Sequence, residues 1–325
     1  MKSLLFPDLV RGVLLQRYKR FLIDAQLQDG SEVTASVANP GRMTGGDDGA
    51  AERGYAVPSQ TAIYLQPVAP NYNVKHAYRW MFAVEPCTGA LVGVYTMLAN
   101  RAVREALEAR EASLLQLLTE RDPNGRRGTV VRPLRFDKLA RECRYPTASR
   151  QRANGSTVSR CDFCLDDRVF IEVKSVTMLS STPGLVMFPD AVSARAVRHL
   201  EELANVIRWG RKRLRDGAAT SVHRAVVLLV VQRSDRPLAF CPAQRVDPLF
   251  AIAMRHAASH GVEFRCCWLP ARVQEEREGR ATVEVHWGRA TEGGNATDCA
   301  WHEVPVFLSM EEAQQYLQGE LDPRR

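Results

Sequence analysis

Two acidic residues and a lysine lie close together in the chain, in a pattern that suits the hydrolysis of phosphodiesters. Asp162 precedes Glu172 and Lys174, and a single valine separates the latter two. Mg²⁺ prefers oxygen ligands and keeps several waters, so two carboxylates and a phosphate oxygen suit it. A neighbouring lysine can stabilise charge on the phosphate or orient the attacking water. The residue types therefore predict Asp162, Glu172 and Lys174 as catalytic residues, with Mg²⁺ or Mn²⁺ held by the two carboxylates.

A β-hairpin is the element that must position these groups. Residues 161–165 and 169–173 are both strand-like, and Asp166-Asp167-Arg168 suits a short turn between them. This register places Asp162 opposite Glu172, with Cβ atoms about 5 Å apart. Two carboxylates at that distance repel each other unless a cation lies between them. The alternative is a solvated hairpin face, on which a Glu-x-Lys string is common.

The charge distribution favours a polyanionic partner. The chain has 325 residues, 45% hydrophobic and 25% charged, and a net charge of +7. Residues 101–160 contain fourteen Lys or Arg against seven Asp or Glu, so this region alone carries an excess equal to that of the whole chain. Cations over phosphates release counterions and thereby bind nucleic acid. The alternative is a set of solvated helix and loop faces.

The location expected for the protein is intracellular, most simply cytoplasmic. The first apolar run is too short for a signal peptide, and no later run is long enough to span a membrane. The eight cysteines then read as reduced, mostly buried thiols. The sequence sets no oligomeric state.

The first part of the chain, residues 1–86, reads as short strands separated by turn signals, which is typical of a small barrel. The strands are expected at 10–15, 21–27, 33–37, 62–67 and 80–84.

Residues 87–270 read as a three-layer α/β domain, and residues 271–325 as an extension with one strand, at 282–287, and a surface helix. Helices are expected at 99–118, from Ser193 as N-cap to about residue 216, and from Asp247 and Pro248 to about residue 259. The apolar run at 223–232 predicts a fully buried strand, and 262–268 a further one. Loops are expected at 47–59, 121–132 and 148–159.

Several runs in this order resemble the sugar fermentation stimulation protein A (SfsA) family, over most of residues 4–270. The matching runs are Arg17-Tyr18-Lys19-Arg20-Phe21-Leu22, Gly41-Arg42-Met43-Thr44-Gly45, Leu91-Val92-Gly93-Val94, Asn100-Arg101, Asp162-Phe163, Glu172-Val173-Lys174-Ser175-Val176-Thr177, Phe188-Pro189-Asp190-Ala191-Val192, His199-Leu200 and Val230-Val231-Gln232-Arg233-Ser234-Asp235. The chain departs from the family pattern at Ala38-Asn39-Pro40-Gly41 and at 194–200.

The resemblance implies a fold and a function. The fold is an N-terminal OB-like β-barrel followed by a PD-(D/E)XK nuclease-like α/β/α domain. The family is described as binding DNA without sequence preference and as linked to sugar (maltose) metabolism. It places Asp162, Glu172 and Lys174 at the nuclease-like motif. A Glu on the first core helix completes the metal shell in related folds, and Glu105 is the position chosen here.

Candidate DNA contacts follow from the basic residues of these segments. Arg17-Tyr18-Lys19-Arg20 alternates basic and aromatic side chains, which suits the nucleic-acid groove of an OB-type barrel. An amphipathic strand whose cations face water explains the same residues equally well. Arg195 and His199 are four apart on a helix, so both can face one site. Asp190 is expected to hold its loop by accepting backbone N–H bonds. The candidate contacts are Arg17, Lys19, Arg20, Arg42, Lys75, Arg101, Arg160, Arg195 and His199.

The sequence leaves two functions open. In the first, the protein is a Mg²⁺- or Mn²⁺-dependent DNA nuclease. In the second, the same cleft binds DNA without turnover and the protein acts as a regulator. Single-stranded DNA or RNA is a further candidate substrate, because OB-like barrels bind both.

Overall fold

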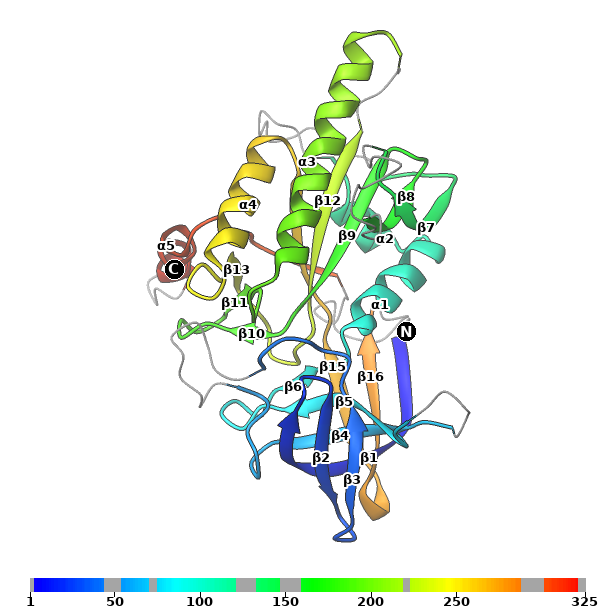
Figure 1. Cartoon of the computed structure of the whole chain (residues 1–325), viewed down its shortest axis with the longest axis vertical. Coiled ribbons are helices and arrows are strands. Elements are labelled where there is room, and N and C mark those ends of the chain that lie inside the picture. Colours follow the sequence, from blue (N-terminus) through cyan, green and yellow to red (C-terminus); the bar gives the residue numbers. More distant parts are fainter. Residues whose placement is uncertain are drawn as a thin grey trace.

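A computed structural model describes residues 3–43, 54–69, 75–120, 133–146, 159–218, 223–287 and 301–320. The loop expected at 121–132 and all but residue 159 of that at 148–159 lie outside these ranges, as do residues 47–53 of the loop expected at 47–59, whose described part includes the buried Tyr55 and Ala56. Figure 1 shows a β-barrel below a larger α/β domain.

The barrel closes because its first strand pairs with two others. Its strands are β1 (Ser3–Tyr18), β2 (Leu22–Leu27), β3 (Glu32–Ser36), β4 (Ala62–Pro67) and β5 (Tyr78–Val84). They are paired in the order β1-β2-β3-β5-β4, and β4 pairs back to β1. Alternate side chains such as Leu14, Ile23 and Trp80 fill the interior. The predicted barrel strands are therefore present, and β1 is longer than expected.

The additional length of β1 recruits the end of the chain. Its first half pairs with β16 (Arg280–His286), which pairs with β15 (Ala271–Glu275) across the short helix η2 (Arg277–Gly279). Val283 and Val285 of β16 are buried in one cluster with Leu4 and Phe6. The first part of the segment expected as a C-terminal extension, residues 271–286, thus returns to the barrel, because its alternating apolar residues need a buried face.

A six-stranded mixed sheet forms the centre of the second domain, in the order β17-β14-β12-β9-β8-β7. The strands are β7 (Leu139–Arg144), β8 (Arg160–Leu165), β9 (Val169–Val176), β12 (Arg224–Val231), β14 (Glu263–Trp268) and β17 (His302–Val304). The strands β9, β12 and β14 are parallel to one another. The strand β12 is buried from Ala225 on, as its uninterrupted apolar run predicted.

Helices cover both faces of this sheet (Figure 1). Leu228 and Val230 of β12 point into the cluster formed with α1 (Met97–Glu108) and α2 (Ala112–Leu117). Val227 and Leu229 point the other way, toward α3 (Ala194–Arg215) and α4 (Pro248–Ser259). The period of two in a strand thus produces a three-layer arrangement.

The helix expected at 99–118 is interrupted. Arg110 lies between α1 and α2 with φ of 54°, a left-handed conformation that stops an α-helix. Its guanidinium stacks on the ring of Phe136, with 3.6 Å from Cζ to the ring centroid. The tertiary contact with Phe136 accompanies the break, and nothing in the apolar pattern of the helix signals it.

The predicted caps of α3 and α4 are confirmed. The Ser193 hydroxyl accepts a hydrogen bond from the Ala196 N–H at 3.1 Å, and the Asp247 carboxylate accepts one from the Phe250 N–H at 3.0 Å. The cap at Ser193 fixes the direction in which α3 leaves the loop that precedes it.

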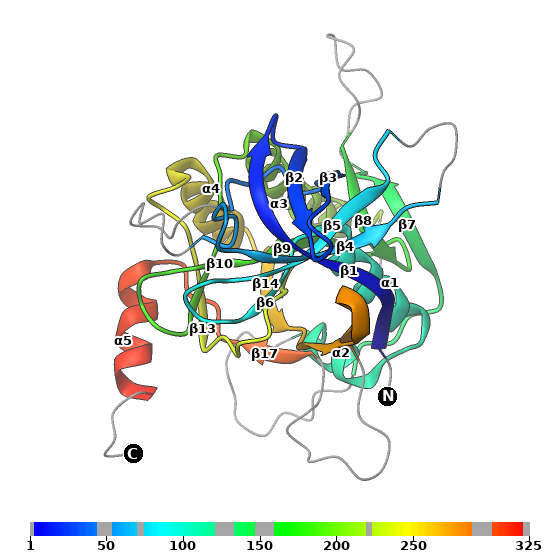
Figure 2. The same ribbon diagram turned by 90° about the horizontal axis from the view of Figure 1, so that it is seen from below.

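A small third sheet lies at the side of the α/β domain. It consists of β10 (Met178–Leu179), β11 (Leu185–Phe188) and β13 (Ala239–Pro242). The C-terminal helix α5 (Met310–Glu320) packs against it through Ala313 and Leu317. Figure 2 shows α5 at the periphery, away from the barrel strands.

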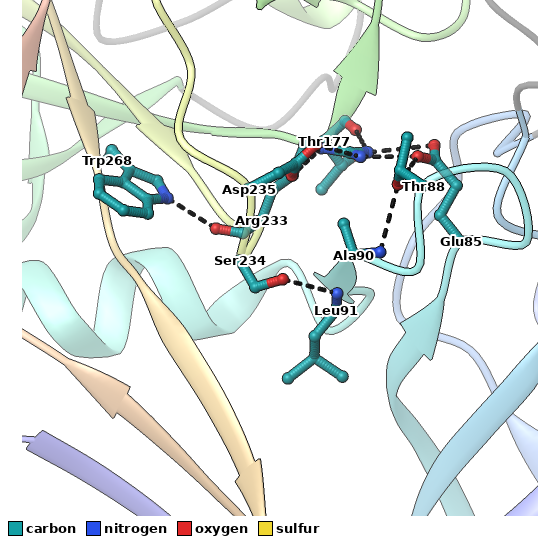
Figure 3. A network of polar contacts seen from close by, with 9 residues as sticks. All are labelled: Glu85, Thr88, Ala90, Leu91, Thr177, Arg233, Ser234, Asp235 and Trp268. Atoms are coloured by element: carbon teal, nitrogen blue, oxygen red, sulfur yellow. Dashed lines mark hydrogen bonds and ion pairs between the residues drawn. The ribbon is translucent and has the colours of Figure 1, made fainter.

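A buried ion network joins the two domains (Figure 3). Arg233, which follows β12 and is fully buried, binds Glu85 from the end of β5 at 2.8 Å and Asp235 at 2.8 Å. It also donates to the Thr177 carbonyl at 3.0 Å. The short strand β6 (Leu91–Gly93) pairs with β5 and touches the same turn, since the Leu91 N–H donates to the Ser234 hydroxyl.

Candidate functional site

The hairpin of β8 and β9 has the predicted register. Leu165 pairs with Val169 and Phe163 with Ile171, and Asp162 and Glu172 are the next residues of the two strands toward the open end. Asp162 reaches across the hairpin, and its Oδ2 accepts a hydrogen bond from the Val173 N–H at 2.7 Å. The two carboxylates therefore lie on neighbouring strands of the sheet, because β8 and β9 are paired.

Glu172 is buried and has three partners. Its Oε1 accepts a hydrogen bond from Lys174 Nζ at 2.7 Å and contacts His199 Nδ1 on α3, while its Oε2 accepts one from the Tyr145 hydroxyl at 3.2 Å. Burial alone raises the pKa of this carboxyl, but Lys174 and His199 outweigh it and lower the pKa to about 2. Glu172 is therefore ionised at neutral pH.

Asp162 has weaker partners and the opposite pKa shift. Its Oδ1 accepts a hydrogen bond from Asn100 Nδ2 at 2.8 Å. Burial, and then the charge of Glu172, raise the pKa of Asp162 to about 6. This carboxylate carries a negative charge that nearby groups compensate only in part, which is the electrostatic condition that favours a bound cation.

The helix residue at this carboxylate is Asn100 and not the expected Glu105. Glu105 forms an ion pair with Arg101 at 3.0 Å on the surface of α1. Five residues of α-helix rotate a side chain by about 140°, so positions 100 and 105 cannot both face Asp162. Within the described part of the chain, no group of three or more His, Cys, Asp or Glu is placed to hold a metal ion. Glu105 is therefore paired with Arg101 and is not brought to Asp162.

A cleft of about 1080 Å³ lies in front of these groups, between the two domains. Asp162, Glu172 and Lys174 line it from the α/β domain. Among the candidate DNA contacts, those that line it are Arg17, Lys19, Arg20, Arg42 and Arg195. Across the cleft, the two carboxylates and Lys174 are therefore surrounded by cations from the barrel and from the first turn of α3.

Arg17 has a structural role within this cleft. Its guanidinium donates hydrogen bonds to the carbonyls of Arg20, Asn39, Gly41 and Arg42 at 2.7 to 2.9 Å. Those bonds hold the loop at 39–42 against the β1–β2 turn. Arg17 is therefore occupied by backbone, whereas Lys19 and Arg20 are exposed in that turn.

Four other candidate contacts lie outside the cleft lining. Lys75 is exposed in front of β5, Arg160 is exposed at the start of β8, and Arg101 is paired with Glu105. His199 is 3% exposed and bonded to Glu172, so it positions that carboxylate and is not placed to contact DNA. The spacing of four residues between Arg195 and His199 predicted that both lie on one face of the helix. It could not show which of the two would be buried.

The loop at 39–42 also contacts the α/β domain. Burial raises the pKa of Asp190, and a hydrogen bond from the Met43 backbone opposes this shift, so Asp190 accepts a backbone N–H as predicted. The Thr96 hydroxyl donates to the Ala38 carbonyl at 2.7 Å, and Tyr55 bonds to Thr177 at 2.9 Å. One wall of the cleft is therefore fixed to the other at its inner end.

Tyr145 and Asn100 are the site residues that the motif did not indicate. Asn100 belongs to the run Asn100-Arg101 that the chain shares with the family, and this shared run is the feature of the sequence that could have indicated it. Tyr145 follows β7 and lies far in sequence from the motif, so only the folded sheet brings it to Glu172.

Comparisons with known proteins agree over both domains. A family model described as the SfsA N-terminal OB domain matches residues 15–94, and one described as the sugar fermentation stimulation protein RE domain matches residues 97–275. A sugar fermentation stimulation protein homolog of Ruegeria sp. is 36% identical over 264 residues, 79% of this chain and 90% of that protein. The homolog of Shewanella baltica is 33% identical over 82% of this chain and 94% of that protein.

A solved structure supports the same fold. The structure of Pyrococcus furiosus SfsA in complex with Ca²⁺ matches with a TM-score of 0.59 and 21% identity, covering 94% of this chain and 99% of that one. No described helix of this chain is both long enough and apolar enough to cross a membrane.

Proposed function

This chain belongs to the SfsA family, and we propose that it binds DNA without sequence preference and hydrolyses phosphodiester bonds with a divalent metal ion. The observation that carries the proposal is the position of Asp162, Glu172 and Lys174 in a cleft that the barrel lines with cations. We assign the α/β domain to the PD-(D/E)XK nuclease-like folds on the same hairpin. The alternative of a solvent-exposed hairpin face does not account for Glu172, because that side chain is only 3% exposed.

The donor set fits a hard divalent cation. Asp162 and Glu172 offer carboxylate oxygens from neighbouring strands, and burial, followed by the charge of Glu172, raises the pKa of Asp162, so a cation beside it would stabilise its charged form. Mg²⁺ keeps several waters, so it needs one or two protein carboxylates beside a phosphate. A related protein, that of Pyrococcus furiosus, was solved with Ca²⁺. When bound, Mg²⁺ or Mn²⁺ would neutralise phosphate charge and lower the pKa of a water ligand.

The chain's own residues supply positioning and charge. Asn100 and the Val173 N–H hold Asp162, while His199 and Tyr145 hold Glu172. Lys174, fixed by Glu172, contacts the phosphate at the cleft or orients the attacking water. The cleft cations that can contact flanking phosphates are Lys19, Arg20, Arg42 and Arg195, of which Arg195 also donates a hydrogen bond from Nε to His199 Nε2 at 3.5 Å.

A DNA-binding protein without turnover, acting in regulation, is the second candidate. One observation favours it: both oxygens of Glu172 already have partners within the protein, which compete with a metal ion. In this case the cleft binds DNA through its cations alone.

The two functions separate in a cleavage assay. Supercoiled plasmid and single-stranded DNA and RNA are incubated with Mg²⁺ or Mn²⁺ and the wild type, Asp162→Asn or Lys174→Met. We expect metal-dependent cutting by the wild type and a loss on the order of 100-fold or more in each variant, the scale of removing one electrostatic group from a site. Glu275→Gln and Arg11→Met are matched controls, because these exposed side chains pair at 3.4 Å on the barrel and do not line the cleft.

Each outcome decides between the candidates. Cutting that persists in both site variants rejects the assigned site. No cutting by the wild type, together with salt-sensitive binding, supports the regulator. Binding that does not change with salt rejects both functions, since phosphate contacts release counterions.

A further inference from the structure

The end of α3 carries a second concentration of positive charge, distant from the cleft. The residues are Arg208, Arg211, Lys212, Arg213 and Arg215, which we call the distal basic surface. Residues 211–218 are all exposed, and Figure 1 shows this end of α3 extending beyond the sheet. Because this end of α3 buries no apolar face, packing against the rest of the domain does not explain why the helix extends so far.

These cations have few partners within the protein. The side chains of Arg211, Lys212 and Arg215 make no ion pair or hydrogen bond with any described residue. By contrast, Arg224 and Arg265 of the same domain both bind Glu263. Favourable interaction with the helix dipole accounts for cations in the last turn only, and Arg208 and Arg211 precede it.

A hollow of about 460 Å³ adjoins this surface, lined by basic and aromatic side chains. Arg144 of β7 and Arg213 contribute charge, and the Trp209 indole lies edge-on to His223 with ring centroids 4.9 Å apart. Arg213 covers the Trp209 ring at 4.9 Å. Asp167, the acidic residue of the lining, is already bound by Lys138 at 2.8 Å. Cations beside aromatic rings suit a nucleic-acid strand.

One continuous helix connects the two basic regions. Arg195 lies in the first turn of α3, at the cleft, and Arg215 at its last residue. Twenty residues of α-helix span about 30 Å, which is the length of about nine base pairs of duplex. A DNA molecule must therefore exceed that length to reach both ends.

We propose that the distal basic surface binds the backbone of duplex DNA that extends beyond the cleft. The inference rests on the proposed function, because it names where the flanking part of the same substrate lies. It predicts a contact that depends on DNA length, whereas the cleft residues act at every length.

The test compares duplexes of 8 and 30 base pairs by fluorescence anisotropy, without metal, at several salt concentrations. The variant is Arg211→Ala/Lys212→Ala/Arg215→Ala. We expect its affinity for the 30-base-pair duplex to fall on the order of 10-fold and its salt slope to decrease by about 2 to 3, since each lost phosphate contact removes about 0.9. Its affinity for the 8-base-pair duplex should equal that of the wild type.

The control variant is Arg236→Ala/Arg245→Ala/Arg277→Ala, which removes the same charge from exposed positions elsewhere. Circular dichroism melting verifies that both variants fold. The inference is overturned if the distal variant binds the long duplex like the wild type, loses affinity equally for both lengths, or is matched by the control. If the wild type binds neither duplex, the proposed function itself fails and the inference fails with it.

Discussion

At the residue scale, burial acts alike on Asp162 and Glu172, and their partners decide the outcome. Burial raises the pKa of both carboxyls. Glu172 has Lys174 and His199 beside it, and its pKa falls to about 2, whereas Asp162 has an amide and a backbone N–H, and its pKa rises to about 6. The site therefore holds one strongly ionised carboxylate and one that a cation would stabilise.

This difference predicts how stability depends on pH. An acid with a higher pKa in the folded protein binds protons more tightly when folded, so its contribution to stability is present at low pH and is lost as the pH rises. For Asp162 the window runs from its ordinary 3.8 to about 6. In EDTA, the wild type should lose on the order of 1–3 kcal/mol relative to Asp162→Asn between pH 4 and 6.5.

Urea unfolding at a series of pH values measures this difference. The Glu172 shift has the opposite sign, and its contribution is lost below the usual range of that group, as pH falls toward 2. Its stabilising contribution is therefore largely present throughout pH 4 to 6.5 and is common to the wild type and Asp162→Asn. A difference between wild type and Asp162→Asn that stays constant across the window would contradict the assigned environment of Asp162.

At the scale of elements, the sequence predicts what local chemistry determines. The alternation of residues 161–173 and the turn at 166–168 give the hairpin register, and Ser193 and Asp247 give the starts of two helices. The break at Arg110 and the position of Asn100 depend on contacts with distant segments, so the apolar period could not reveal them. For the same reason the sequence could not show that Glu105 pairs with Arg101 while Asn100 reaches Asp162, and it did not indicate Tyr145.

The loop at 39–42 is an element whose function in the fold can be tested at one glycine. A Cβ added at Gly41 would lie 1.9 Å from Asp190 Oδ2, far inside van der Waals contact. Gly41→Ala should therefore force the barrel loop away from the α/β domain and cost about 1–3 kcal/mol of unfolding free energy. Urea denaturation gives the value.

Gly319→Ala is the matched control, because a Cβ there meets no atom within 4 Å. Since Gly319 lies within α5, alanine should leave stability unchanged or raise it by up to about 1 kcal/mol. Equal stability of Gly41→Ala and the wild type would show that this contact between the domains is loose.

At the scale of the whole molecule, the buried ion network of Arg233 couples the two domains. Removal of Arg233 leaves Glu85, which is 1% exposed, without its charged partner. Arg233→Ala should cost about 3–5 kcal/mol, the usual cost of breaking a buried pair on one side. Calorimetry should then show two transitions where the wild type shows one, since the domains lose their common anchor.

Two further variants make that prediction specific. Asp235→Ala should cost less, because Asp235 is 36% exposed and water can replace it. The double variant Arg233→Met/Glu85→Leu should recover part of the loss, since it leaves no unpaired buried charge. A single transition in Arg233→Ala at nearly wild-type stability would mean that other contacts hold the domains together.

The pairing of β1 with β16 has a consequence for the chain as it is synthesised. Ser3 pairs with His286, so the outer edge of β1 stays uncovered until β16 has been synthesised. At ordinary rates of translation, about 5–20 residues per second, the ribosome needs roughly 15 to 60 s to make the intervening chain. During that interval Leu4 and Phe6 have no β16 to pack against, and the nascent barrel presents an open strand edge. A strand edge left open in this way can pair with another chain, so the nascent protein is most prone to aggregation before β16 is made.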